Sequence, residues 1–129
     1  MTATRQGAGD TGARGIIAGF VSNGETLHED IEVTENGTVI AGADDWEWQF
    51  NLYEFDSDVL VLSLSTTGDS TVTNTVDATV IGLRASFSVM AAIPAGDYEA
   101  FLGSVDDVDR RILWARGTIT IREEVFWVD

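Results

Sequence analysis

The segment Trp46-Glu47-Trp48-Gln49-Phe50-Asn51-Leu52 decides the fold class of this chain. Large apolar side chains occupy every second position, so Trp46, Trp48, Phe50 and Leu52 face one side of an extended strand and the polar residues between them face the other. A repeat of two residues excludes a helix, whose apolar positions recur every three or four residues. The segment therefore predicts a half-buried β-strand over residues 46–55.

Other strand-like segments lie on both sides of this one, separated by turn residues. Asn36-Gly37 favours a type I′ turn, because both residues tolerate positive φ, and it predicts a hairpin over residues 28–41. Residues 59–65 begin with apolar side chains on both faces, which predicts a central strand covered on both sides. Residues 70–84 are rich in Thr and Val, which pack well on a pleated surface, and predict one or two strands.

The second half of the chain adds a helical turn and two more strands. Apolar residues spaced three and four apart predict one short helical turn near residues 85–93, which Pro94 ends. A strand over residues 97–103 and a long strand over residues 110–122 follow, and Gly117 suggests a bulge in the last one. About seven or eight short strands in one chain predict an all-β fold, either a sandwich or a barrel.

Composition narrows the function before any motif is considered. The chain has 129 residues, enough for one domain, and 22 acidic against 7 basic residues give it a formal net charge of −15. Such a surface repels the phosphates of nucleic acids and of anionic membranes, so we expect neither as a partner. There is no Cys, hence no disulfide and no thiolate nucleophile. The apolar run at residues 16–21 is too short to cross a membrane.

The two ends of the chain differ from its middle. Residues 1–15 are rich in glycine and predict an arm that packs either on its own domain or on a neighbouring chain. Residues 16–122 form the expected β-sandwich domain. Residues 123–129 form a tail with four consecutive apolar residues that must pack on the domain or on a partner. We take the candidate partner contacts from these ends: Arg5, Arg14, Phe126, Trp127 and Val128.

The sequence offers little for catalysis or for metal binding. His28 is the sole histidine, and no Cys or Gly-x-Ser-x-Gly motif supplies a nucleophile beside it, so we interpret it as a solvated strand residue. Asp106, Asp107 and Asp109 could offer hard oxygen ligands to calcium but lack the EF-hand spacing, and we interpret them as a solvated acidic turn. We predict no enzymatic activity, no catalytic residues, no metal site and no cofactor.

Four segments, in this order, resemble a known family. They are Asp45-Trp46-Glu47-Trp48-Gln49-Phe50, Leu62-Ser63-Leu64-Ser65-Thr66, Ile93-Pro94-Ala95-Gly96-Asp97-Tyr98 and Arg116-Gly117-Thr118-Ile119-Thr120-Ile121. Together they resemble the immunoglobulin-like N-terminal domain of phage baseplate upper proteins and of related phage and prophage accessory proteins. The resemblance spans about residues 28–122 and implies an immunoglobulin-like antiparallel β-sandwich of 7–8 strands. Ile93 replaces the Leu that is usual before the proline, and the family's first strand has no clear counterpart here.

The resemblance also implies a role. A protein of this family would be made in the host cytoplasm and built into the virion, as a capsid decoration or as a head, collar, tail or fibre-attachment module. Its partners would be other virion proteins and copies of itself, in a homo-oligomeric assembly. The alternative is a carbohydrate-binding module, in which exposed tryptophan or tyrosine rings stack on sugars beside acidic groups. The alternative requires Trp46 and Trp48 to line an open platform.

Overall fold

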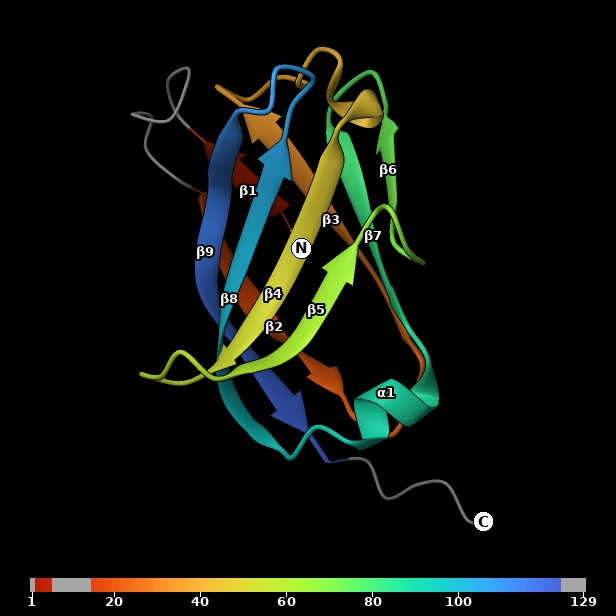
Figure 1. Ribbon diagram of the computed structural model, residues 1–129, viewed down its shortest axis with the longest axis vertical. Coiled ribbons are helices and arrows are strands. Elements are labelled where there is room, and N and C mark those ends of the chain that lie inside the picture. The colour runs from red at the N-terminus through yellow and green to blue at the C-terminus, as the bar shows by residue number, and fades with distance from the viewer. Residues whose placement is uncertain (1, 6–14, 124–129) are drawn as a thin grey trace.

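Two β-sheets pack face to face in the computed structural model, which describes residues 2–5 and 15–123 (Figure 1). The four-stranded sheet has the order β1-β3-β7-β6, with strands at Thr2–Arg5, Leu27–Glu35, Thr79–Ala85 and Thr71–Asn74. The five-stranded sheet has the order β2-β9-β8-β4-β5, with strands at Gly15–Ser22, Arg111–Arg122, Gly96–Val105, Glu47–Glu54 and Leu60–Ser65. The predicted all-β sandwich is confirmed.

The pairing is not antiparallel throughout. β1 runs parallel to β3, with Thr2 opposite Glu32, and β2 runs parallel to β9, with Gly15 opposite Ala115. All other strand pairs are antiparallel. The first part of the predicted arm therefore adds a strand to a sheet of its own domain. Residues 6–14 and 124–129 lie outside the described residues.

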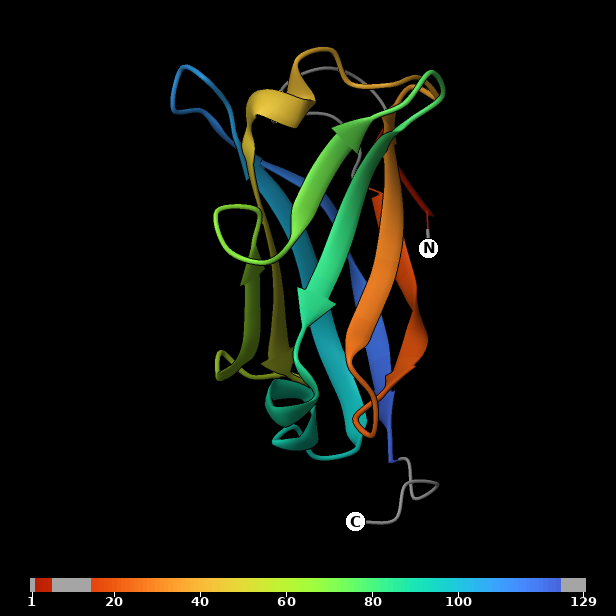
Figure 2. The ribbon, with the colours of Figure 1, turned by 90° about the vertical axis from the view of Figure 1, so that its right-hand side faces the viewer.

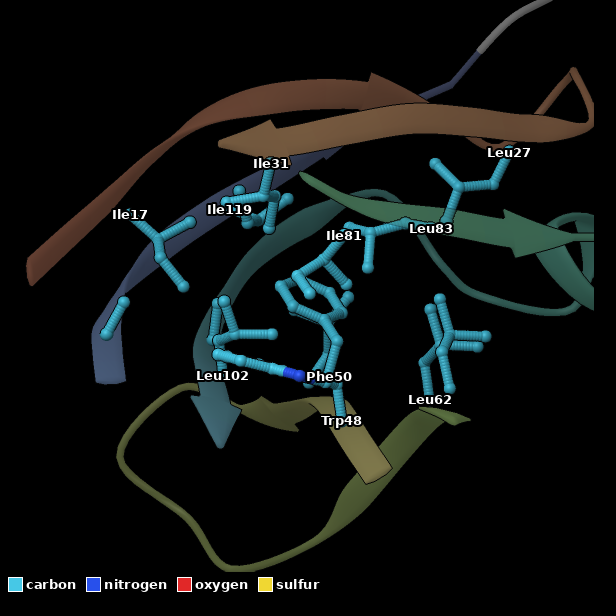
Figure 3. Packing of buried hydrophobic residues seen from close by; sticks show 14 of the residues in the cluster. Ile17, Leu27, Ile31, Trp48, Phe50, Leu62, Ile81, Leu83, Leu102 and Ile119 are labelled. Carbon is cyan, nitrogen blue, oxygen red and sulfur yellow. The ribbon is translucent and has the colours of Figure 1, made fainter. Parts of the chain in front are cut away.

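The Trp46 segment becomes β4, which lies between β5 and β8 and supplies the centre of the core (Figure 3). Trp48, Phe50 and Leu52 are buried, whereas Gln49 is exposed on the other face, as the alternation predicts. From the opposite sheet, β3 and β7 contribute buried aliphatic side chains that include Ile31, Ile81 and Leu83. Burial of these side chains is the main source of stability in a chain that has no disulfide.

The predicted hairpin over residues 28–41 forms only its turn. Asn36 and Gly37 have φ of 53° and 81°, as a type I′ turn requires, and a single bridge joins Glu35 to Thr38. The return strand is missing because side chains of the neighbouring strands bind the backbone of Ile40. The Asn74 amide donates to the Ile40 carbonyl oxygen at 3.0 Å, and the Ile40 N–H donates to the Thr79 hydroxyl oxygen at 3.3 Å.

The prediction that residues 59–65 form a central strand is wrong. They form β5, which pairs with β4 alone and stands at the edge of the five-stranded sheet (Figure 2). Leu62 and Leu64 point into the core, whereas Leu60 is 49% exposed. Residues 70–84 do form two strands, β6 and β7, within the alternatives that the sequence left open.

Gly117 is not the site of a bulge. The register of β8 and β9 shifts between Leu102 and Gly103 instead, which pair with Ala115 and Leu113, so the extra residue of β9 at this point is Trp114. Gly117 is needed because β2 passes very close to it: a Cβ atom there would lie 1.7 Å from the carbonyl oxygen of Ile17. Only a residue without a side chain allows the two backbones to approach in this way.

The predicted helical turn is confirmed as α1, at Phe87–Ala91. The Ser86 hydroxyl caps it by accepting a hydrogen bond from the Val89 N–H at 3.4 Å. The Tyr98 hydroxyl donates to the Pro94 carbonyl oxygen at 2.6 Å and fixes the loop between α1 and β8. Burial, with a smaller contribution from the nearby Glu54 carboxylate, raises the pKa of Tyr98, which keeps this hydroxyl protonated as a donor.

Candidate functional site

The structure places few of the contact residues that the sequence singled out. The backbone of Arg5 ends β1, opposite Glu35 of β3. Arg14 and the tail residues Phe126, Trp127 and Val128 lie outside the described residues. The surfaces considered below are formed by residues 15–123.

Trp46 and Trp48 do not form an open platform. Trp46 stacks on both Trp48 and Trp114, with ring centroids 6.3 and 6.5 Å away. Trp48 and Trp114 meet at a tilt, with their centroids 5.7 Å apart, and both are buried. Their indole nitrogens are satisfied inside the protein: Trp48 Nε1 donates to the Ala43 carbonyl oxygen at 2.9 Å, and Trp114 Nε1 donates to the Ser104 hydroxyl at 2.7 Å. These rings support the core, so the condition set for a tryptophan-based sugar platform is not met.

The outer face of the five-stranded sheet carries two adjoining hollows, of about 540 and 370 Å³, which share Asn51 and Phe101 as lining residues. Tyr53 meets the Phe101 ring edge-on, at 5.6 Å between centroids. The guanidinium of Arg116 lies 5.6 Å from the centre of the same ring. No motif in the sequence predicts this aromatic and polar surface; the signal for it is the alternation of β4, which places Asn51 and Tyr53 on the side opposite the core.

The acidic turn after β8 is held together by its own carboxylate. Asp106 accepts hydrogen bonds from the Val108 and Arg110 backbone N–H groups at 3.1 and 2.8 Å and from Arg110 Nε at 2.9 Å. Burial would raise the pKa of Asp106, but these hydrogen bonds and the Arg110 charge outweigh it and lower the pKa. Asp106 thus has a structural role in its loop, whereas the Asp107 and Asp109 residues beside it are exposed.

Residues 15–123, with the short strand β1, show no grouping of three His, Asp or Glu side chains able to hold a metal ion. His28 is exposed on β3, where it stands opposite Arg84 of β7. The ion pairs in this part of the chain join Arg84 to Asp30 and Arg110 to Asp106. No arrangement of a nucleophile and a base follows from these contacts.

The edge strand β5 presents backbone groups that pair with no other strand among the described residues. The Thr66 N–H donates to the Trp48 carbonyl oxygen at 3.0 Å. Since bonded residues alternate along an antiparallel ladder, Leu64 and Leu62 also point their backbone groups toward β4. The N–H and C=O of Ser63 between them point away from β4, toward the free edge. β5 has no charged residue and no proline, the usual protections of an exposed edge.

A groove of about 370 Å³ lies beside this edge, between the two sheets. β5 supplies Leu62 and Leu64, β7 supplies Arg84 and Ala85, and α1 supplies Val89. Five of the exposed large apolar side chains belong to α1, to the turn between β4 and β5 or to the first residue of β5, which lie at the same end of the sandwich (Figures 1 and 2). They are Phe55, Val59, Leu60, Phe87 and Val89. This end combines open backbone with uncovered apolar surface, which favours contact with another polypeptide.

No protein-family model matches the chain, and no curated protein matches it. None of the helices in the described ranges has the length and apolar character needed to cross a lipid bilayer.

Proposed function

We propose that the protein is a structural protein of a phage particle, in which an immunoglobulin-like sandwich acts as an assembly module. Its partners are other virion proteins and copies of itself, and it works by protein–protein contact without catalysis. It acts in the virion, after synthesis in the host cytoplasm. In the particle it serves as a capsid decoration or as a head, collar, tail or fibre-attachment module.

Support comes first from the four segments that carry the family resemblance. They fall on β4, β5, the start of β8 and β9, four strands that are neighbours in the five-stranded sheet. The third segment contains the Tyr98 to Pro94 hydrogen bond, which anchors the loop after α1. The resembling residues thus build one rigid framework, as expected of a module whose function is to hold neighbours in place.

The observation that carries the proposal is the uncovered apolar surface at the β5 end. The hollow between Leu27, Phe50 and Met90 inside the core measures only about 10 Å³, too little to enclose a ligand. Phe55, Leu60 and Phe87 are nevertheless left about half exposed or more. Apolar surface of this kind, beside an open strand edge, is typical of a protein–protein contact.

The proposal is tested on the particle itself. Mass spectrometry of purified phage particles, from the virus that encodes this chain, should detect the protein in a fixed ratio to the major capsid protein. Cryo-electron microscopy of the same particles should show the sandwich with its β5 end against a neighbour. Absence of the protein from purified particles contradicts the proposal.

A carbohydrate-binding module is the second candidate, and the outer hollows favour it. Tyr53 and Phe101 offer aromatic surface there, and Asn51, Glu99 and Asp58 line the same hollow with polar groups. This arrangement fits a sugar ring better than the buried tryptophans do. A glycan array should then give a hit that Tyr53→Ala abolishes and Phe55→Ala, an exposed aromatic outside the hollows, retains. An array without hits contradicts this candidate.

A further inference from the structure

The free edge of β5 has room for a further strand, and the sequence outside the described residues contains a segment of suitable composition. Residues 125–128 are Val-Phe-Trp-Val, four uncharged residues whose types have high strand propensity. If such a segment pairs with Ser63, alternate side chains point into the groove between the sheets. That groove, lined by Leu64 and Val89 among others, measures about 370 Å³ and has room for apolar side chains.

A segment cannot pair with the β5 edge of its own chain if it starts too far away. The described chain ends at Glu123, just after β9, and the sheet order puts β8, β4 and β5 between β9 and the free edge. Four strand spacings of about 4.8 Å make about 19 Å. Residues 124–128, fully extended at about 3.5 Å each, span about 17 Å. They would be used up in crossing the sheet, with nothing left to pair along β5.

We therefore propose that residues 125–128 of one copy add a strand to the β5 edge of a second copy. This inference rests on the proposed function, since it names one partner of the assembly module as another copy of the same chain. The contact has no net charge: β5 and residues 125–128 carry no charged side chain, and the groove beside β5 is lined by one basic and one acidic residue, Arg84 and Asp69. A contact without net charge suits a protein with a net charge of −15, whose copies otherwise repel each other. The donor and the acceptor are different surfaces, so the contact is head-to-tail unless two copies exchange strands reciprocally.

Two variants of the full chain separate the donor from the acceptor. Ser63→Pro removes the one outward N–H of Ser63 and leaves the bonds between β4 and β5 in place. Ser63→Ala is its matched control, since it removes the hydroxyl that donates to the Asn51 side chain at 2.7 Å but keeps the N–H. The donor variant is Phe126→Ser with Trp127→Ser. Circular dichroism and thermal melts check that every variant is folded.

Sedimentation velocity over a range of concentrations measures self-association. The unmodified chain and Ser63→Ala should associate equally, Ser63→Pro about tenfold more weakly for one lost backbone hydrogen bond, and the donor variant not detectably. The decisive sample mixes Ser63→Pro with the donor variant. Ser63→Pro keeps an intact donor segment, and the donor variant keeps an intact β5 edge. The mixture should therefore form a 1:1 complex that is tighter than the self-association of either variant.

Three results would overturn the inference. An unmodified chain that stays monomeric means that the edge serves another partner or that the segment packs on its own domain. A donor variant that still associates means that two β5 edges pair with each other. A mixture that shows no complementation means that donor and acceptor are not the two surfaces named. None of these results removes the protein from the particle, so the proposed function is tested separately by its presence there.

Discussion

The tryptophan cluster and the free edge of β5 lie in the same sheet but differ in how completely they are paired. Around Trp48 the indole N–H, the ring faces and the backbone all have partners within the protein. At Ser63 one side of the backbone has none among the described residues, and Leu60 and Val59 nearby are about half exposed. The two regions are joined by the ladder between β4 and β5.

This difference teaches where stability and interaction are located. A region whose polar groups are all satisfied stabilises the monomer and offers nothing to a partner. A region with an unpaired edge contributes less to the monomer and can gain hydrogen bonds on association. Substitutions should therefore separate the two properties along a single sheet.

The largest effect is expected at the tryptophan cluster. Trp48→Ala removes a side chain that is 1% exposed and should lower the free energy of unfolding by about 3–5 kcal/mol, as large core truncations do. Trp46→Ala, at the half-buried end of the same stack, should cost clearly less. Urea unfolding followed by circular dichroism measures both. Equal losses of unfolding free energy in the two variants would mean that the greater burial of Trp48 does not make it more stabilising than Trp46.

The next effect concerns β2, the opposite edge strand of the sheet. Gly117→Ala places a Cβ atom 1.7 Å from the Ile17 carbonyl oxygen, so β2 must move away from β9. We expect a loss of about 1–3 kcal/mol, typical of overpacking, together with faster hydrogen exchange of the β2 amides. Gly68→Ala is the control, since its Cβ atom would lie 3.4 Å from the nearest backbone oxygen. Unchanged β2 exchange in Gly117→Ala would show that the strand is not held at that distance.

The sequence predicts those parts of this comparison that depend on local pattern. The alternation around Trp48 predicts which face of β4 is buried, and Asn36-Gly37 predicts the turn after β3. Both depend only on the residues of the segment itself. The sequence cannot show that residues 39–41 lack a strand partner, since the side chains that bind Ile40 come from Asn74 and Thr79, more than thirty positions away.

The edge position of β5 also depends on distant parts of the chain, so the sequence of the strand does not predict it. Leu60–Ser65 has the same apolar composition whether it is central or at an edge, and only the sheet order decides which. The groove beside it joins Leu64 to Arg84 and Val89 of the other half of the chain. A surface assembled from both sheets leaves no signal in the spacing of either one.

A smaller effect, dependent on pH, is expected at the loop between β8 and β9. Folding lowers the pKa of Asp106 below its ordinary value of 3.8. The ionised carboxylate therefore stabilises the fold at a pH above 3.8, and this stabilisation is lost as the pH falls through the lower pKa of the folded state. Asp106→Asn should melt at a lower temperature than the unmodified protein at neutral pH, and the difference should shrink in acid. Asp107→Asn, an exposed neighbour, is the control. A difference that persists in strong acid would assign the effect to packing.

The smallest effect is expected at the free edge, where the monomer should tolerate a change that a core strand would not. Ser63→Pro should change the stability of dilute monomer by about 0.5 kcal/mol or less, because its N–H has no partner in the ladder. Leu64→Pro, one residue further, loses the bond to Phe50 and should cost about 3 kcal/mol more than Leu64→Ala, which corrects for the lost side chain. Thermal melts at low concentration compare the four proteins. Equal losses of stability in Ser63→Pro and Leu64→Pro would mean that the Ser63 N–H does not point away from β4. The free edge would then be paired as completely as the tryptophan cluster.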